Sequence, residues 1–330
     1  MYRLITYLKG SKMAYTKETK SFVSPDKETE IAYYVYTPDQ TPKGIFHILH
    51  GLFEYTERYE HFAENLSENG FVVCGADMRG HGKSVKTNEE LGYFGDKNGC
   101  EFFSRDVEEL RLIMRQKYRR LPYIMFGHGM GSLVLRDYMI DHGKDIDGAI
   151  VAGTVGGSYS AKKDIILTRI KAIFGGGKAH KDSFKKKIFK GFETAFNEKT
   201  PNAWLSGDPE IGIAASKDEL CNFELTTYGY IDLLKLYQSV SHPDWVNDIP
   251  QSLPVFLVSG KNDPVGGNGE DINELYKSMQ DAEIKNLSIK LYKGARHELV
   301  NETNKDEVFA DVNTWCDIII EGVIECNKLN

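Results

Sequence analysis

The chain of 330 residues carries a net charge of −7 at pH 7, with 27% charged and 41% hydrophobic residues. This is an ordinary globular balance, and an α/β chain of this length often forms one domain with an insertion. The acidic balance argues against a nucleic-acid partner, because phosphate neutralisation needs a basic face. The five cysteines are widely spaced and match neither a disulfide framework nor a structural zinc site, so a cytoplasmic location is expected.

The first 15 residues contain two short apolar patches that are interrupted by Arg3 and Lys9. They lack the continuous apolar core and the small-residue cleavage site of a secretory signal. No run of about 18 apolar residues occurs in the sequence, so no membrane-spanning helix is expected. We predict a flexible leader over residues 1–15 and leave open a weak contact of this leader with a membrane surface.

Short apolar strands alternate with amphipathic helices along most of the chain. A β-hairpin is predicted first, because residues 20–24 and 30–37 flank the turn dipeptide Pro25-Asp26. Six further strands bring the expected total to eight, and the alternation is typical of a mostly parallel sheet with helices on both faces. The later strands are expected at 44–49, 71–76, 123–126, 147–152, 254–259 and 287–292, and helices at 59–69, 104–118, 133–141, 271–279 and 306–326.

The alternation stops between residues 155 and 240. This segment contains a Lys-rich stretch with helical character, Lys178–Lys190, a triple glycine, Gly175–Gly177, and scattered aromatic residues. We predict a helical cap over the strand ends, with the triple glycine as a loop or hinge and the lysines as a solvated face. The core is then divided into residues 16–154 and 241–330.

A glycine-framed turn, GHGMG at residues 127–131, joins the predicted strand 123–126 to a helix. A strand that turns sharply into a helix forces its central residue into a strained backbone conformation and needs small neighbours. The nucleophile elbow G-x-S-x-G of α/β-hydrolases has this form, but here Gly129 stands in the place of serine. A turn that only permits close packing is the alternative, and the spacing fits no phosphate-binding loop.

Two later loops supply the remaining groups for acyl transfer. Asp263 follows the strand predicted at 254–259, and His297 follows the one at 287–292. Acyl transfer requires a nucleophile, a histidine base and a carboxylate that orients the base. The chain order of Gly129, Asp263 and His297 matches that of α/β-hydrolases. Because the carboxyl ends of parallel strands meet at one edge, we predict that these residues form the catalytic site.

Two backbone amides are predicted to form the oxyanion hole. One belongs to Met130 at the start of a helix, where the first N–H groups are unpaired and the helix dipole favours negative charge. The other belongs to Leu52, which follows His50-Gly51. We interpret His50 as a hydrogen-bonding residue that shapes this loop, not as the base, and His128 as a supporting residue.

Six segments carry motifs that are specific in combination: LHGLFEYTERYEHFAENL, GADMRGHGKS, GYFGDKNG, MFGHGMGS, VSGKNDPVGG and YKGARHELVNE. Through them, roughly residues 25–153 and 250–325 resemble α/β-hydrolases of the serine aminopeptidase-like group, which holds monoacylglycerol lipases and bacterial lysophospholipases. The resemblance implies the α/β-hydrolase fold with a cap that gates an apolar channel. It also implies cleavage of an ester of a small acyl or glycerolipid substrate through an acyl-enzyme, without a cofactor or metal. It leaves the oligomeric state open.

Gly129 departs from the serine of that family. Ser132 lies about one helical turn further on, and Ser84 in the RGHGKS loop has no group beside it that would activate it. Loss of the nucleophile of such a triad costs about 10⁶-fold in turnover. We therefore expect a chain that folds and binds substrate but is nearly inactive.

Several explanations of this glycine stay open. A recent or engineered replacement in a competent esterase is favoured by the intact Asp263 and His297. The chain could instead be an acyl-binding pseudoenzyme, or His297 could activate a water held in the space of the missing hydroxyl. An aminopeptidase or amidase on the same scaffold would need acidic cap residues near the site, and the candidates are Asp208, Glu210 and Asp218.

Overall fold

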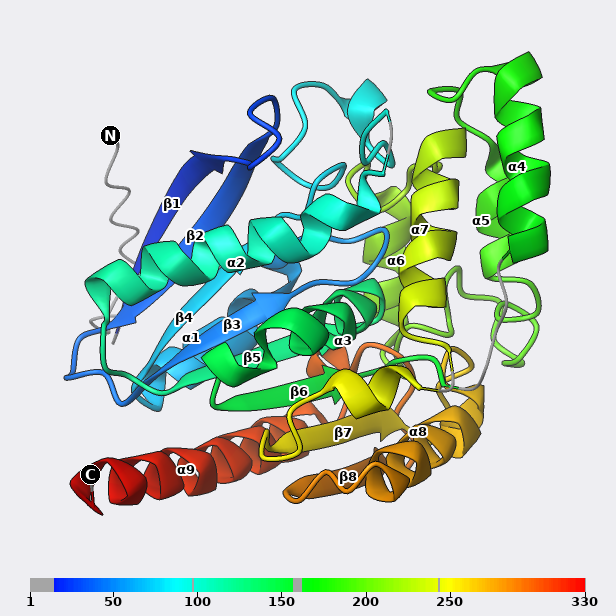
Figure 1. Cartoon of the computed structure of the whole chain (residues 1–330). Coiled ribbons are helices and arrows are strands. Elements are labelled where there is room, and N and C mark those ends of the chain that lie inside the picture. Colours follow the sequence, from blue (N-terminus) through cyan, green and yellow to red (C-terminus); the bar gives the residue numbers. More distant parts are fainter. Residues whose placement is uncertain (1–14, 97, 157–161, 243, 330) are drawn as a thin grey trace, which may run out of the picture.

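The computed structural model describes residues 15–96, 98–156, 162–242 and 244–329. Its centre is a sheet whose strands are β1 (Tyr15–Val23), β2 (Glu30–Pro38), β3 (Gly44–Leu49), β4 (Phe71–Ala76), β5 (Tyr123–His128), β6 (Gly148–Ala152), β7 (Val255–Gly260) and β8 (Leu287–Tyr292). Their spatial order is β1-β2-β4-β3-β5-β6-β7-β8. Strand β2 is antiparallel to both of its neighbours, and all other neighbouring strands are parallel (Figure 1). The predicted eight-stranded, mostly parallel sheet is confirmed.

Helices cover both faces of this sheet. Residues of α2, α3 and α8 pack in one buried cluster, and residues of α1 and α9 pack in another on the opposite face (Figure 1). The helices are α1 (Glu60–Glu68), α2 (Cys100–Lys117), α3 (Met130–His142), α4 (Lys162–Gly175), α5 (Asp182–Ile188), α6 (Pro209–Lys217), α7 (Thr227–Ser239), α8 (Glu270–Asp281) and α9 (Lys305–Leu329). Short 3₁₀ turns are η1 (Thr56–Tyr59), η2 (Asn88–Glu90), η3 (Gly143–Asp145), η4 (Trp245–Asp248), η5 (Gly267–Gly269) and η6 (Leu299–Asn301).

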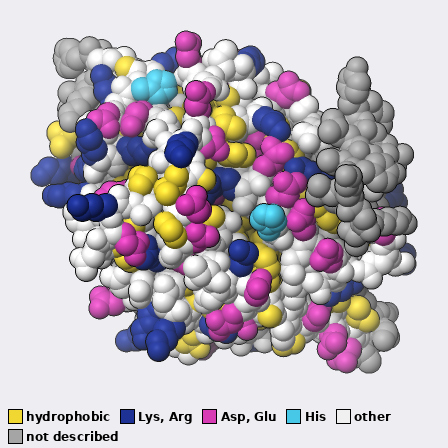
Figure 2. Space-filling view, turned by 180° about the vertical axis from the view of Figure 1, so that it is seen from behind, with side chains coloured by type: hydrophobic (Ala, Val, Ile, Leu, Met, Phe, Trp, Pro, Cys, Tyr) yellow, Lys and Arg dark blue, Asp and Glu magenta, His cyan; other side chains and the backbone are white. Residues whose placement is uncertain are grey.

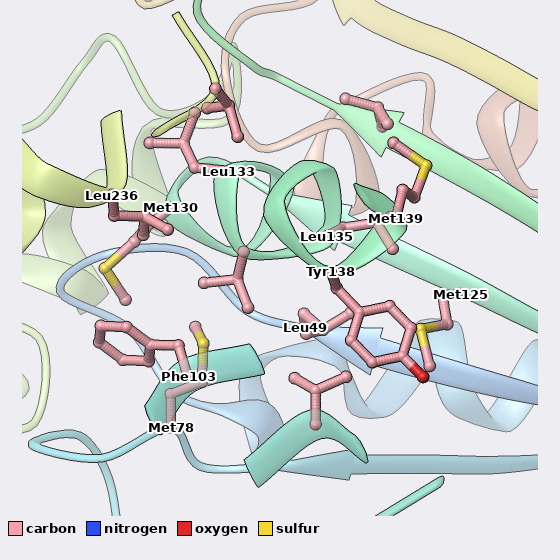
Figure 3. Packing of buried hydrophobic residues seen from close by; sticks show 14 of the residues in the cluster. Leu49, Met78, Phe103, Met125, Met130, Leu133, Leu135, Tyr138, Met139 and Leu236 are labelled. Atoms are coloured by element: carbon pink, nitrogen blue, oxygen red, sulfur yellow. The ribbon is translucent and has the colours of Figure 1, made fainter. Parts of the chain in front are cut away.

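The central strands are buried on both faces, which explains why their sequences are continuous apolar runs. In β5, Met125 faces the cluster that contains α3, whereas Phe126 faces the cluster that contains α1. Figure 3 shows the first of these clusters, where Leu135 and Tyr138 of α3 lie near Met125. Strands covered on both faces carry apolar side chains at successive positions, not only at alternate ones.

Helices α4–α7 lie between β6 and β7 in the chain, within the segment 155–240, which we call the helical insertion. The prediction of a helix over Lys178–Lys190 is wrong in extent, because only α5 forms there. The backbone before it pairs with another segment: His180 forms an isolated bridge with Thr226, and the amide of Lys181 donates to the carbonyl of Leu225. The triple glycine begins at Gly175, the last residue of α4.

The predicted leader over residues 1–15 is wrong at its last residue, since Tyr15 begins β1 and pairs with Pro38. The rest of the leader lies outside the described residues. No helix in the described part of the chain is both long enough and apolar enough to cross a bilayer. On the face opposite the view of Figure 1, acidic and basic side chains are interspersed (Figure 2).

Candidate active site

Gly129 occupies the turn between β5 and α3. Its backbone has φ +53° and ψ −118°, a conformation that residues with a side chain rarely adopt. A Cβ placed on Gly129 would lie 3.3 Å from Nε2 of His297 and 3.5 Å from Cα of Gly51. A side chain at this position would therefore point at the imidazole of His297, beside the loop that follows β3.

Asp263 and His297 come from the loops after β7 and β8 and meet beside Gly129. Nδ1 of His297 lies 3.0 Å from Oδ2 of the fully buried Asp263. The Asp263 carboxylate also accepts a hydrogen bond from the amide of Val265 at 2.9 Å. A carboxylate oxygen accepts, so Nδ1 of the imidazole donates to it, and in the neutral imidazole the lone pair of Nε2 faces Gly129.

The residues predicted for the oxyanion hole lie on the same side of the turn. Leu52 and Met130 both line the cavity beside Gly129. Met130 is the first residue of α3, so its amide has no acceptor within that helix. The two amides come from the β3 and β5 ends of the sheet, which are adjacent strands.

His50 shapes the loop that carries Leu52. Its Nε2 accepts a hydrogen bond from the amide of Met78 at 2.8 Å, so its Nδ1 carries the proton and donates to the carbonyl of Gly51, also at 2.8 Å. Burial lowers the pKa of this imidazole, which keeps it neutral. Both ring nitrogens are thus used in holding the loop together.

His128 lies directly before Gly129, and its imidazole contacts the buried carboxylate of Glu54. Its Nε2 lies 3.1 Å from the backbone carbonyl of His297, and its Nδ1 lies 3.0 Å from Oε1 of Glu54. The carbonyl of His297 can only accept, so Nε2 donates to it, while Nδ1 also lies 2.8 Å from the hydroxyl of Tyr59. Burial lowers the pKa of His128, but the hydrogen bond and charge of Glu54 outweigh burial and raise it overall. The hydrogen bond from His128 to the backbone carbonyl of His297 therefore helps to hold the loop that carries His297.

A second ion pair lies beside the first. Both oxygens of Glu298 accept from the guanidinium of Arg58, at 2.7 and 2.6 Å. Tyr59 donates to Glu54 at 2.7 Å. Glu54, Arg58, Tyr59 and Glu298 all lie in the sequence motifs, but no role was predicted for them. A linear motif does not show which side chains meet near the turn that carries Gly129.

The helical insertion contacts the His297 loop directly. The amide of His297 donates to the carbonyl of Trp204 at 3.3 Å, and the amide of Glu298 donates to that of Leu205 at 2.7 Å. The Trp204 indole packs against the imidazole, with ring centroids 5.3 Å apart. The insertion therefore helps to fix the position of the imidazole.

A cavity of about 350 Å³ opens at Gly129 and extends under the helical insertion. This volume lies within the range of small-molecule sites. Glu54, His128, His297 and Glu298 line the cavity beside Gly129, and Lys187, Tyr230 and Tyr237 line it from α5 and α7. The other lining side chains are apolar. The lining residues are Leu52, Glu54, His128, Gly129, Met130, Leu133, Val155, Lys187, Ile188, Phe189, Phe192, Trp204, Leu205, Tyr230, Leu233, Leu234, Tyr237, Val265, His297 and Glu298.

Neither serine near the motifs is placed to replace the missing nucleophile. Ser132 donates its hydroxyl proton back to the carbonyl of Gly129. Ser84 donates to the carbonyl of Asp77 and accepts from the amide of Ala32. Both hydroxyls therefore form hydrogen bonds with backbone groups.

Two of the acidic residues considered for an aminopeptidase site form other hydrogen bonds. Asp208 caps the start of α6, where it accepts from the amide of Glu210 at 3.0 Å. Asp218 accepts from the hydroxyl of Tyr55 at 2.9 Å. Asp208, Glu210 and Asp218 are not among the described residues that line the cavity.

Comparison with known proteins identifies the family. The family described as serine aminopeptidase, S33, matches residues 40–304. The chain belongs to this family. The monoacylglycerol lipase of Mycolicibacterium smegmatis is 25% identical over 289 residues, which cover 86% of this S33 chain and 92% of the relative. The monoglyceride lipase of Saccharomyces cerevisiae is 25% identical and covers 86% and 89%.

A solved structure supports the same assignment. The thermostable carboxyl esterase of Bacillus coagulans, in complex with glycerol, has a TM-score of 0.85 and 30% identity, covering 92% of this chain and 99% of the esterase. The predictions of the α/β-hydrolase fold and of the family are confirmed. This S33 chain is a monoglyceride-lipase-like α/β-hydrolase.

Proposed function

We propose that this S33 chain carries the site of a carboxylic-ester hydrolase of the monoacylglycerol lipase type. The acyl chain of the substrate lies in the apolar cavity under the helical insertion, which acts as a cap. The ester carbonyl lies at Gly129, between His297 and the amides of Leu52 and Met130. The cavity, the Asp263–His297 pair and the lipase relatives support this assignment.

One observation carries the proposal: a Cβ at position 129 would lie 3.3 Å from Nε2 of His297. A serine hydroxyl is one bond beyond that Cβ, within hydrogen-bonding reach of the lone pair on Nε2. Position 129 is thus built for a nucleophile that His297 deprotonates. With glycine there, none of the described residues is placed to attack the carbonyl, so we expect the chain to be nearly inactive.

The mechanism in a chain with serine at 129 follows from this arrangement. The hydroxyl attacks the ester carbonyl while His297 takes its proton, and Asp263 stabilises the resulting imidazolium. The amides of Leu52 and Met130 bind the oxyanion. His297 returns the proton to the leaving alcohol, and water then hydrolyses the acyl-enzyme by the same route.

The test is the change Gly129→Ser. We expect the variant to cleave short p-nitrophenyl esters and monoacylglycerols and to react with a fluorophosphonate probe. Gly129→Ala is the matched control, because it adds the Cβ without the hydroxyl and stays unreactive. Gly129→Ser combined with His297→Gln should lose most of the recovered activity. A folded Gly129→Ser variant that neither cleaves esters nor binds the probe covalently would contradict the proposal.

Gly129 itself favours a second candidate, a protein that binds an acyl ligand without turning it over. The cavity is present whether or not a nucleophile is. Saturable binding of a fatty acid by the unmodified chain, together with no activity in Gly129→Ser, would select this function.

An aminopeptidase or amidase has less support. A substrate ammonium needs an unneutralised carboxylate near the scissile bond. The carboxylates that line the cavity, Glu54 and Glu298, are paired with His128 and Arg58. Activity of Gly129→Ser toward aminoacyl p-nitroanilides, and none toward esters, would reverse this preference.

A further inference from the structure

Arg136 in α3 is a buried cation that forms no ion pair with a carboxylate of the described residues. Its side chain is 1% exposed, and no salt bridge involves it among the described residues. Burial lowers the pKa of its guanidinium to about 9. A charge without an opposite charge is costly in a protein interior, so its hydrogen bonds must compensate.

The guanidinium contacts both points at which the chain passes between the sheet and the helical insertion. One terminal nitrogen donates to the carbonyl of Val155 at 2.7 Å and to Oγ1 of Thr154 at 3.2 Å, just after β6. The other donates to the carbonyl of Val240, just after α7. The guanidinium carbon also lies 4.4 Å from the ring centroid of Trp245. One side chain thus holds both ends of the insertion.

We call these two points the crossings, the first just after β6 and the second just after α7. Further contacts restrict the first crossing. The amide of Gly156 donates to Oδ2 of Asp271 at 3.2 Å, and a Cβ on Gly156 would lie only 2.1 Å from the Asp271 carbonyl oxygen. The hydroxyl of Tyr237, from α7, donates to the carbonyl of Gly156 at 3.3 Å. The two crossings are therefore held to α8 and to each other as well as to Arg136.

The same residues form one wall of the cavity. Val155, whose carbonyl Arg136 binds, lines it, and so do Tyr237 near the second crossing and Leu133 one turn earlier in α3. Arg136 is not among the described residues that line the cavity. Its effect on a ligand must therefore pass through the position of this wall.

We propose that Arg136 is a positioning residue that joins both ends of the helical insertion to α3 and thereby determines which acyl chains fit the cavity. The planar guanidinium binds several carbonyls in a fixed fork, which a single lysine ammonium cannot do. The part of the proposal that concerns acyl chains rests on the proposed ester hydrolysis. The part that concerns the two crossings does not.

The first experiment compares Arg136→Met and Arg136→Lys in the Gly129→Ser background. We expect the ratio of kcat/KM for p-nitrophenyl palmitate to that for the acetate to change about tenfold in Arg136→Met, since a pocket discriminates single methylenes by about tenfold or more. Arg136→Lys should not restore the parent ratio. Arg111→Met is the matched control: it breaks the pair with Glu108 on α2 and should lower stability but leave the ratio unchanged. A folded Arg136→Met with the parent ratio would overturn the proposal.

The second experiment measures hydrogen exchange of the unmodified chain, so it needs neither a folded Arg136 variant nor esterase activity. Amides in residues 153–156 and 239–242 should exchange as slowly as those of α3. Arg136→Lys, where it folds, should speed exchange in both segments together. Fast exchange in either segment of the unmodified chain would overturn the proposal. If both segments exchange slowly but Gly129→Ser is inactive, the proposed ester hydrolysis is rejected and the role of Arg136 at the two crossings is not.

Discussion

Glycine at position 129 relieves a strain that a serine there must bear. The backbone has φ +53°, and a Cβ would meet Nε2 of His297 at 3.3 Å, so the neighbouring imidazole must give slightly. We predict that Gly129→Ser lowers the free energy of unfolding by roughly 0.5–2 kcal/mol. Urea denaturation measures this difference. Gly129→Ala should show a similar loss, because the strain comes from the Cβ; a serine variant as stable as the parent would contradict the explanation.

The ion pair between His128 and Glu54 makes stability depend on pH. The pKa of His128 is raised above 6.5 in the folded chain. Its contribution is therefore fully present below the unfolded value and is lost as pH rises through the folded value. Burial raises the pKa of Glu54, but its hydrogen bond with His128 and nearby positive charges outweigh burial and lower it. The contribution of Glu54 is present above its unfolded value and is lost at acid pH.

We therefore predict that His128→Gln destabilises the chain most near pH 6, by about 3 kcal/mol, the cost of breaking a buried ion pair. The difference from the parent should shrink as the pH rises above 6.5 and the parent loses the proton of His128, whose pKa is raised in the folded chain. Urea denaturation at several pH values measures it. A difference that stays constant or grows with pH would show that His128 is neutral.

At the scale of elements, the strands followed from sequence more closely than the helices of the insertion. β3, β4 and β8 begin and end where their apolar runs predict, because each run is bounded by turn residues. Helix α2 begins at Cys100, four residues before the predicted start, and α5 is much shorter than its lysine-rich stretch. Helical character in that stretch was overruled by pairing with residues 225 and 226, which local sequence cannot show.

We predict that Trp204, in the helical insertion, contributes both to stability and to catalysis. Its indole is 4% exposed and packs on Phe189 and His297. Trp204→Ala should lower stability by about 3–5 kcal/mol. In the Gly129→Ser background it should also slow labelling by the fluorophosphonate probe, since the imidazole loses a neighbour.

Trp315→Ala is the control for this change. Trp315 stacks on Phe256 on the other face of the sheet, away from the cavity. It should lower the melting temperature without slowing the labelling of folded protein. If Trp204→Ala labels as fast as its parent, the indole has only a packing role.

At the scale of the whole molecule, the unmodified chain should bind an uncleavable ligand. A monoalkyl glycerol ether has the chain and polar head of a monoacylglycerol but no ester. At 100 times its Kd it should stabilise the fold by about 2.7 kcal/mol, because it binds only the folded state. Thermal unfolding with increasing ether measures this shift. Glycerol alone is the control, and an unchanged melting temperature with the ether would contradict an acyl cavity.

The sequence by itself determined the class of fold, the family and the order of Gly129, Asp263 and His297. Hydrophobic periodicity and short motifs are local properties, so they can be read without knowing which segments meet. Only the tertiary structure decided which side chains lie beneath the turn, where Glu54 and His128 form their pair. It also decided that Arg136 joins both ends of the helical insertion. These contacts link residues far apart in the chain, and only the folding of the sheet and the insertion brings them within hydrogen-bonding distance.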